Sequence, residues 1–368
     1  MTAAALSSGL IASGHRVTVV APKLSGAVFT RPKLVGEVRH DCVKVWFLGT
    51  WLQVGFKTIN PGAIVLIPRL VAGSEYVIVH GLRTFCGSIA GLCCLLLGKP
   101  YVVFPHGMIV PRWRSLLKKR VYDAVLGKRL LRCAEKIVCL SAAEREEAIQ
   151  ATGRDPRDVV VIDAGQLEER PRVLHQPPAW DVARILFLGR LVPEKSIELV
   201  IDAIAEQGLR AKYEIWLAGP EESKHYAACL RERADRLHVT IHFTGGVYGA
   251  DRDDLIMESH LLALVSEYES YGRVAMEALQ LGTPVLVSNT CGIARELDRR
   301  CGSVVNRSVR EIGEALVNLC AQDFRELRAL RNSCRKDSRD GEPGGVAEVV
   351  DLILCGPRKE VPSQPVSN

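Results

Sequence analysis

Residues 269–284 of the chain read ESYGRVAMEALQLGTP, and apolar residues flank them on both sides. The preceding run Leu261–Val265 and the following run Pro284–Val287 have the length and character of buried strands. Gly272 predicts the pivot from a loop into a helix, because glycine adopts backbone conformations that other residues avoid. The segment therefore predicts a strand, a loop, a helix and a second strand, as in a parallel α/β sheet.

Two carboxylates lie on either side of this pivot. Glu269 would lie in the loop and Glu277 in the second turn of the helix. Backbone N–H groups at such a helix start favour an anion, and the carboxylates could hold neutral hydroxyl groups on either side of it. A sugar linked to a diphosphate fits this arrangement. An ordinary strand-loop-helix unit with two solvated glutamates explains the pair equally well.

The same alternation of short apolar runs and helical segments continues along the chain, and it predicts two doubly wound α/β domains with parallel sheets. The active site is expected in the cleft between the two sheets. The expected strands are 16–20, 43–48, 76–80, 101–104, 136–140 and 159–162 in the first domain, and 184–188, 214–218, 239–243, 261–265, 284–288 and 303–305 in the second. Expected helices include 3–13, 85–97 and 142–151, the last with Ser141 and Glu144 as a capping box.

Proline and charge mark the expected domain boundaries. We expect a first domain over residues 1–166, a linker over 167–182 and a second domain over 183–345, followed by a return helix over 346–355 and a disordered tail over 356–368.

The composition is typical of a globular enzyme of this size. The 368 residues suffice for two hydrophobic cores, with 48% hydrophobic and 24% charged residues. The net charge of +6 is unevenly distributed: residues 1–170 carry 23 Lys and Arg against 13 Asp and Glu, whereas the remainder carries 25 against 29. We therefore expect the first half to favour an anionic partner.

The 12 cysteines do not have the spacing of a metal site, since none form a C-x-x-C pair. Cys93, Cys94, Cys133 and Cys139 lie in apolar runs and are expected to be buried. The sequence also shows no basic signal-peptide start, and the apolar run 87–98 is too short to span a bilayer. We expect a cytoplasmic protein without structural zinc.

A second motif opens the second domain, where residues 187–196 read FLGRLVPEKS. Gly189 at a strand end would let the backbone approach a ligand closely. Arg190 and Lys195 could then bind phosphate, the first through a bidentate guanidinium and the second as a point charge. By itself the motif is also compatible with two solvated surface cations.

Together these motifs resemble those of the retaining glycosyltransferases of family 4, which have the two-domain GT-B fold. The resemblance covers nearly the whole chain and is tightest over 186–296. It comprises G-R-x4-K at Gly189, Arg190 and Lys195, E-x7-E at Glu269 and Glu277, A-x3-G-T-P over 278–284, and the later Gly292 and Glu296.

The resemblance implies transfer of a sugar from a nucleotide sugar with retained anomeric configuration. Arg190 and Lys195 would neutralise the departing diphosphate. Glu277 would hold the ribose hydroxyls, and Glu269 would contact the donor sugar. Gly189, Gly272 and Arg273 complete the expected donor-binding set.

His106 is the candidate near the reacting carbon, because it follows the expected strand 101–104 where family members often place such a histidine. A lone histidine is also commonly structural. No metal is expected, since Arg190 and Lys195 would supply the positive charge. The acidic pair Asp251 and Asp253 starts an expected helix, where carboxylates suit the helix dipole.

The stretch 111–136 is strongly basic, with nine Lys and Arg against two acidic residues. Its apolar residues lie largely along one helical face, so it could lie on an anionic membrane surface. A core-facing helix with a solvated basic side is the alternative, and nucleic-acid binding is disfavoured because no recognised module accompanies it. The apolar residues are Trp113, Leu116, Leu117, Val121, Val125 and Leu126.

Three departures from the family pattern stand out. The first strand and glycine loop of the N-terminal domain are not present in the sequence, so the strand at 16–20 is expected to have at most one neighbour. Residues 163–165 read DAG where a proline-asparagine-glycine turn is usual, and Ser196 replaces the glycine that usually follows the lysine.

The favoured function is transfer of a sugar to a glycan or polyprenyl-linked acceptor in exopolysaccharide or cell-surface polysaccharide synthesis, at the inner face of the membrane. A truncated, catalytically impaired nucleotide-sugar-binding or scaffold protein is the alternative. An epimerase on the same fold is less favoured, because the two motifs together resemble the transferases better.

Overall fold

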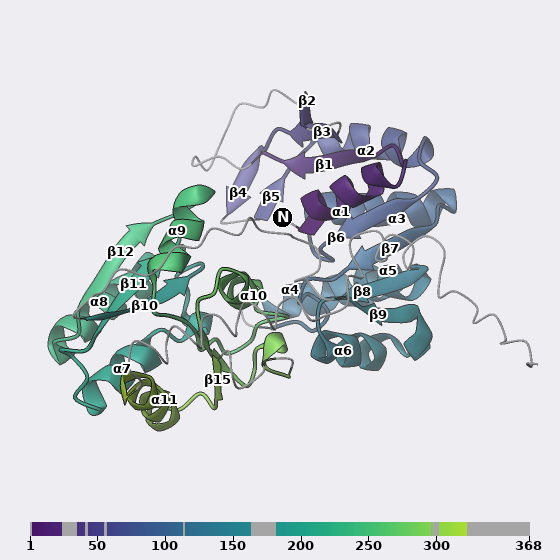
Figure 1. The fold of residues 1–368 in the computed structure, drawn as a ribbon. Coiled ribbons are helices and arrows are strands. Elements are labelled where there is room, and N and C mark those ends of the chain that lie inside the picture. Colours follow the sequence, from purple (N-terminus) through teal and green to yellow (C-terminus); the bar gives the residue numbers. More distant parts are fainter. Residues whose placement is uncertain are drawn as a thin grey trace, which may run out of the picture. The chain divides into compact units, whose positions relative to one another are not determined.

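The computed structural model describes residues 2–23, 35–40, 43–54, 57–112, 115–162, 182–295, 297 and 302–321 (Figure 1). These residues form two compact units. Unit 1 contains residues 2–138 and 148–162, and unit 2 contains residues 139–147 and 182–321. Of the expected linker only Val182 is described, and the expected return helix and tail lie outside the described residues.

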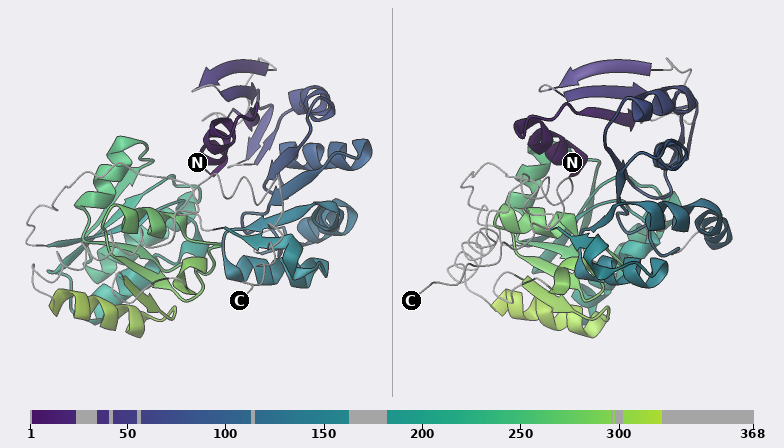
Figure 2. Two further views of the ribbon diagram at one scale, coloured as in Figure 1. Left: turned by 45° about the vertical axis from the view of Figure 1, so that its right-hand side comes forward. Right: turned by 90° about the vertical axis from the view of Figure 1, so that its right-hand side faces the viewer.

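Unit 1 begins with helix α1 (Thr2–Ala12) and a three-stranded sheet in the order β1-β3-β2. The three strands lie side by side in the right-hand view of Figure 2. β1 runs parallel to β3, whereas β2 is antiparallel to it. β1 therefore has one strand neighbour among the described residues, as the sequence predicted. The bounds are β1 Thr18–Pro22, β2 Val35–His40 and β3 Val43–Leu48, followed by the hairpin β4 Leu52–Val54 and β5 Lys57–Ile59.

A second, parallel sheet of unit 1 has the order β6-β7-β8-β9. Its strands match the expected runs within one residue, and β7 is wholly buried because all four of its residues are apolar. The strands are β6 Val77–His80, β7 Tyr101–Phe104, β8 Lys136–Cys139 and β9 Val159–Val161. The helices are α2 Gly62–Ala72, α3 Phe85–Leu97, α4 Leu116–Tyr122, the π-helical turn η1 Asp123–Gly127, α5 Lys128–Cys133 and the 3₁₀ turn η2 Pro156–Asp158. Helix α6 Ala142–Thr152 has its first residues in unit 2 and its last in unit 1.

The sequence prediction was wrong for unit 1 at two points. It did not include β2 or the β4–β5 hairpin, so the unit is not purely parallel. It also placed Cys133 in the interior, whereas Cys133 is exposed at the end of α5. The apolar neighbours Leu130 and Leu131 take the inward-facing positions of that helix instead. Cys94 and Cys139 are buried, as expected.

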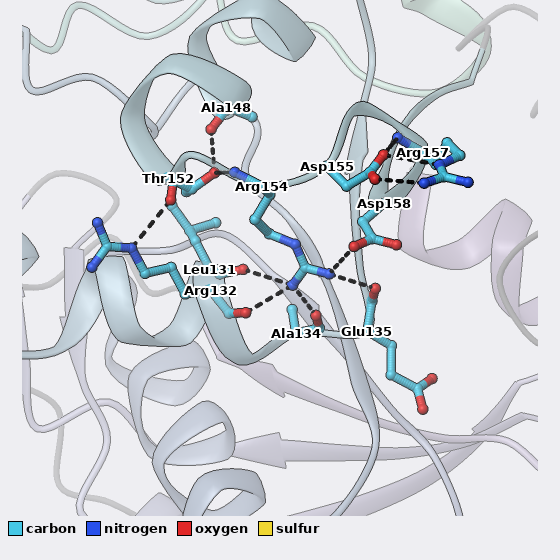
Figure 3. Close-up of polar contacts among 10 residues, drawn as sticks. All are labelled: Leu131, Arg132, Ala134, Glu135, Ala148, Thr152, Arg154, Asp155, Arg157 and Asp158. Atoms are coloured by element: carbon cyan, nitrogen blue, oxygen red, sulfur yellow. Dashed lines mark hydrogen bonds and ion pairs between the residues drawn. The ribbon is translucent and has the colours of Figure 1, made fainter.

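An arginine stabilises the carboxyl end of α5 (Figure 3). Arg154 donates hydrogen bonds to the carbonyl oxygens of Leu131 (3.3 Å), Arg132 (2.9 Å), Ala134 and Glu135 (3.0 Å). The last carbonyls of a helix have no partner within the helix, and a guanidinium supplies several donors to them in one plane. This cluster therefore has a structural role.

Unit 2 contains a single sheet of six parallel strands in the order β12-β11-β10-β13-β14-β15. All six expected strands are present, each within two residues of its predicted bounds. The strands are β10 Ala183–Leu188, β11 Tyr213–Ala218, β12 Ile241–Gly245, β13 Leu261–Leu264, β14 Val285–Ser288 and β15 Gly302–Val305. The connecting helices are η4 Pro193–Lys195, α7 Glu198–Glu206, α8 Lys224–Leu237, α9 Ala250–Glu258, α10 Arg273–Gln280, η5 Gly292–Arg295 and α11 Val309–Ala321.

The core of unit 2 follows from the alternation along its strands. Ile185 and Phe187 of β10 and Ile215 of β11 face one side of the sheet, where they join a buried cluster that includes Ile201 of α7 and Leu316 of α11. The strand order reverses between β10 and β13, because β11 and β12 lie on one side and β14 and β15 on the other. Ligands of doubly wound sheets bind outside the carboxyl ends of the strands at such a reversal. The α/β fold with a Rossmann-like second domain is thus confirmed.

No helix in the described part of the chain has both the length and the apolar character needed to cross a membrane.

Candidate active site

Two glycines allow the ends of β10 and β11 to come together beside the reversal point of the unit 2 sheet, which lies between β10 and β13. Gly189 donates its N–H to the carbonyl of Ala218 at 2.9 Å. A Cβ on Gly219 would lie 1.8 Å from the carbonyl oxygen of Gly189, so a side chain at residue 219 is sterically impossible. The backbone after β10 therefore lies directly against the backbone after β11.

Lys195 and Glu269 form an ion pair between the two sequence motifs. Their side chains are 15% and 21% exposed, so the pair is mostly shielded from water. Ser266, just after β13, donates a hydrogen bond from Oγ to Oε1 of Glu269 at 3.2 Å. The backbone N–H of Glu267 also donates to the carbonyl of Glu194 at 2.8 Å. Folding thus brings together two predicted residues that are 74 positions apart.

The segment that carries Glu269 is held by residues that follow β14. Gly292 donates its N–H to the carbonyl of Glu269 at 3.0 Å, and Ile293 donates to the carbonyl of Tyr271 at 2.6 Å. A Cβ on Gly292 would lie 2.3 Å from the carbonyl oxygen of Ser270, which explains why glycine is needed there. Glu296, the other member of that element, lies outside the described residues.

Gly272 is the pivot that the sequence predicted. Its φ of +97° lies in the left-handed region, and α10 begins at the next residue, Arg273. A Cβ at Gly272 would lie 3.2 Å from Ile293 and 3.3 Å from Leu264, so space is also restricted there. The amino end of α10 carries the partial positive charge that favours an anion.

Glu277 lies in the second turn of α10 and is almost fully buried, with 5% of its surface exposed. Arg252 of α9 pairs with its Oε2, and Arg273 lies 3.5 Å from its Oε1. Burial of an ionised carboxylate requires such partners, because an uncompensated buried charge is strongly unfavourable. The sequence prediction did not assign a role to Arg252, although it lies between Asp251 and Asp253, the two acidic residues that it did consider.

Arg190 has a different partner from Lys195. Its guanidinium lies 2.7 Å from Oε2 of Glu222, which follows β11, and its side chain is 49% exposed. The structure therefore brings Lys195 to Glu269, and Arg252 and Arg273 to Glu277, whereas Arg190 contacts a carboxylate that the sequence prediction did not include. Within the described residues, no cluster of His, Cys, Asp and Glu side chains has the arrangement of a metal site.

Ser196, which replaces the usual glycine after the lysine, adopts a left-handed conformation with φ of +51°. It is buried, and its Oγ accepts a hydrogen bond of 2.7 Å from Arg307, which follows β15. The hydrogen bond offsets part of the cost of a side chain in this conformation.

His106 belongs to unit 1 and follows β7, as expected. Its Nε2 lies 3.0 Å from Nδ1 of His80, which ends the neighbouring strand β6. The two rings are stacked, with centroids 5.3 Å apart, and His80 also stacks on Phe104 at 4.7 Å. His80 was not predicted, although its position at a strand end is the same signal that identified His106.

Comparison with known proteins identifies the family of this chain. Residues 1–165 match the family described as Glycosyl transferase 4-like domain, and residues 176–337 match the family described as Glycosyl transferases group 1. The chain belongs to the GT-B glycosyltransferases. The GT-B chain resembles the crystal structure of Anabaena Alr3699/HepE in complex with UDP and glucose, with a TM-score of 0.68 and 17% identity over 86% of this chain and 87% of that one.

It also resembles the sucrose-phosphate synthase of Thermosynechococcus elongatus, with a TM-score of 0.71 and 17% identity over 95% of this chain and 90% of that one. At these identities the likeness concerns the fold.

Curated relatives match at low identity. The GDP-mannose-dependent alpha-(1-6)-phosphatidylinositol dimannoside mannosyltransferase of Mycobacterium tuberculosis is 24% identical over 336 residues, which are 86% of this chain and 82% of that protein. The D-inositol 3-phosphate glycosyltransferase of Streptomyces scabiei is 26% identical over 63% of this chain and 57% of its own length. An uncharacterized glycosyltransferase of Methanocaldococcus jannaschii is 34% identical over 31% of this chain and 29% of its own length. The chain therefore spans less than two thirds of the length of two of these three relatives.

Proposed function

We propose that this GT-B chain transfers a sugar from a nucleotide-diphosphate sugar to a glycan or polyprenyl-linked acceptor, with retention of the anomeric configuration. The observation that carries the proposal is the Lys195–Glu269 ion pair beside the amino end of α10, with Glu277 buried one turn further along the helix. This arrangement offers a cation and helix N–H groups for phosphate, and carboxylates for hydroxyl groups.

In this proposal Lys195 and Glu269 exchange each other for parts of the donor, whereas Glu277 keeps its partner. Lys195 turns from Glu269 to the diphosphate, which gains negative charge as it leaves. Glu269 then accepts hydrogen bonds from the hydroxyl groups of the donor sugar. Glu277 holds the ribose hydroxyls and keeps Arg252 as its compensating cation. Arg190, Gly189, Gly272 and Arg273 complete the donor-binding set.

The names of similar proteins support a nucleotide-sugar donor. One similar structure holds UDP and glucose, and one relative is described as GDP-mannose-dependent. We place the reaction in exopolysaccharide or cell-surface polysaccharide synthesis on the cytoplasmic side of the membrane, as the sequence resemblance suggests. Because Lys195 and Arg190 supply positive charge for the diphosphate, we expect turnover to persist when divalent metal is removed with EDTA.

The test is a donor screen with UDP-glucose, UDP-galactose, UDP-N-acetylglucosamine and GDP-mannose. Binding is measured by calorimetry, and turnover by release of the nucleoside diphosphate in the presence of polyprenyl-phosphate-linked saccharides. Proton NMR of the product reports its anomeric configuration. An inverted product would contradict the retaining mechanism. Tight donor binding without turnover, with every acceptor tested, would favour the nucleotide-sugar-binding or scaffold alternative.

The basic segment of unit 1 presents an apolar face to solvent, and we propose that this face docks on an anionic membrane. Leu117, Val121 and Val125 are 75%, 56% and 75% exposed, which contradicts the core-facing alternative for these residues. Arg83 pairs with the buried Asp123 of the same segment at 2.5 Å, so this carboxylate does not offset the surface charge. The same segment carries these exposed cations: Lys118, Arg120, Lys128, Arg129 and Arg132. Trp113 lies outside the described residues.

Membrane docking is measured by sedimentation with vesicles of phosphatidylcholine, with and without phosphatidylglycerol. The wild type should bind the anionic vesicles more tightly, and salt should weaken binding. The double variant with Leu117→Ser and Val125→Ser should lose most of the binding to anionic vesicles. Leu96→Ser is the matched control, because Leu96 is 76% exposed on α3, a helix without Lys or Arg. Equal loss in the control would contradict the assignment to this face.

A further inference from the structure

The two histidines of unit 1 form a defined unit at the carboxyl edge of a parallel sheet. His80 and His106 follow adjacent strands, since β6 pairs with β7 in register and His80 lies opposite Phe104. The Nδ1–Nε2 distance of 3.0 Å and the interplanar angle of 17° show a hydrogen bond between stacked rings. The orientation of the His106 ring is thus set by a side chain rather than by solvent.

The backbone around His106 also shows that its placement is constrained. Its φ of +52° is left-handed, a conformation that is unfavourable for a residue with a side chain. Gly107 follows with φ of +74°, and the N–H of Met108 donates to the carbonyl of Pro105 at 3.1 Å to close the turn. Strained residues of this kind are common at functional sites, where the surrounding contacts hold them in place.

The buried, neutral ring of His80 is suited to accept the hydrogen bond. Burial, together with the neighbouring His106, lowers the pKa of His80 to about 3, so His80 is neutral at physiological pH. A neutral ring can accept at Nδ1 when its proton is on Nε2. His106 then donates from Nε2, and this bond persists whether His106 is neutral or carries a second proton. A hydrogen bond in the opposite direction, from Nδ1–H of His80 to Nε2 of His106, would be lost when His106 Nε2 takes up a proton.

We propose that His80 is a positioning residue for His106: it accepts the Nε2–H of His106, and so fixes both the orientation of that ring and the nitrogen that carries its proton. The inference rests on the proposed function and on the expectation, from the sequence resemblance, that His106 acts near the reacting carbon. His80 itself is not expected to touch the substrate. The proposal adds a residue to the site that neither sequence motif contains.

The first test does not depend on activity. In protein labelled with ¹⁵N-histidine, the ring nitrogen shifts distinguish a nitrogen that carries a proton from one that does not. We expect a proton on Nε2 of both His80 and His106 at neutral pH, assigned from the spectra of His80→Asn and His106→Gln. A neutral His106 with its proton on Nδ1 would overturn the proposal, whether or not the chain proves to be a transferase.

The second test uses turnover with the donor from the screen above. His80→Phe keeps an aromatic ring but removes the acceptor, and it should lower kcat by about ten- to a hundredfold with little change in the KM of the donor. His80→Asn places an amide oxygen near the position of Nδ1 and should restore most of the rate. Equal loss in both variants at unchanged thermal stability would contradict the positioning role. If no donor is turned over, the proposed function fails and the NMR result still decides the inference.

Discussion

Two polar clusters of this protein contain buried cations, and their partners differ. In unit 1, Arg154 donates mainly to backbone carbonyls at the end of α5 and also pairs with the carboxylate of Asp158 at 2.9 Å (Figure 3). In unit 2, Lys195 pairs with Glu269, and Arg252 pairs with Glu277, so the acceptors are side-chain carboxylates. A carbonyl at a helix end cannot change its partner without disturbing the helix, whereas a carboxylate can turn to a ligand. The backbone acceptors therefore mark the Arg154 cluster as structural, whereas a carboxylate partner alone does not define a site, since Arg83 and Asp123 form such a pair in unit 1.

The largest effect is expected when the cations of unit 2 are removed. Lys195→Ala should lower kcat by roughly 10²–10³-fold, the scale for loss of one group that stabilises charge in the transition state. Arg190→Ala should also lower kcat, and the Lys195→Ala, Arg190→Ala double variant should lower it further. The measurement is release of nucleoside diphosphate, with Lys212→Ala as an exposed control. A double variant with the parent rate would show that the diphosphate lies elsewhere.

A smaller effect is expected from Glu277→Gln, which keeps the shape but removes the charge. Charge-assisted hydrogen bonds contribute about 1.5–3 kcal/mol, so nucleotide affinity should fall by roughly ten- to a hundredfold. The change also leaves Arg252 without its carboxylate partner, so thermal stability must be measured in parallel. Calorimetry with the nucleoside diphosphate gives the affinity, and the exposed Glu232→Gln is the control. Unaltered affinity would count against the ribose assignment.

Arg154→Ala tests the structural side of the comparison. Several carbonyls at the end of α5 lose their donor, and the free energy of unfolding should fall by on the order of 2 kcal/mol. Turnover per folded molecule should stay near the parent value. Arg157→Ala is the matched control, because Arg157 is 87% exposed and its side chain pairs with Asp155 in Figure 3. Denaturant titration checks both variants, and a specific loss of turnover in Arg154→Ala would blur the distinction between the clusters.

The smallest effect concerns Ser196, which adjoins Lys195. Ser196→Ala keeps the left-handed backbone but loses the bond to Arg307, so it should destabilise the chain. Ser196→Gly loses the same bond and also removes the conformational cost, so it should be more stable than the alanine variant by about 1 kcal/mol. Thermal unfolding of the wild type, Ser196→Ala and Ser196→Gly gives the order of their stabilities. A glycine variant less stable than the alanine variant would contradict this account of the turn.

The sequence by itself determined the order of strands and helices in unit 2 and the main members of the candidate site. Strands such as β10 and β13 could be predicted because they are short apolar runs between polar segments. This signal is contained in the strand residues themselves. The pivot at Gly272 was visible for the same reason, since its φ of +97° requires glycine whatever lies around it. A residue that belongs to a sequence motif and also needs a particular backbone conformation can be predicted before the fold is known.

Only the tertiary structure decided which side chains share a partner. Arg252 contacts Glu277, and His80 contacts His106, because parallel strands and their helices bring distant segments to one edge of a sheet. The same is true of the exposed face around Leu117: its residues have the pattern of a helix, and the pattern is equally compatible with a buried or an exposed apolar side. Burial and pairing depend on what packs against a segment, and that information is distributed over the whole chain rather than contained in the segment itself.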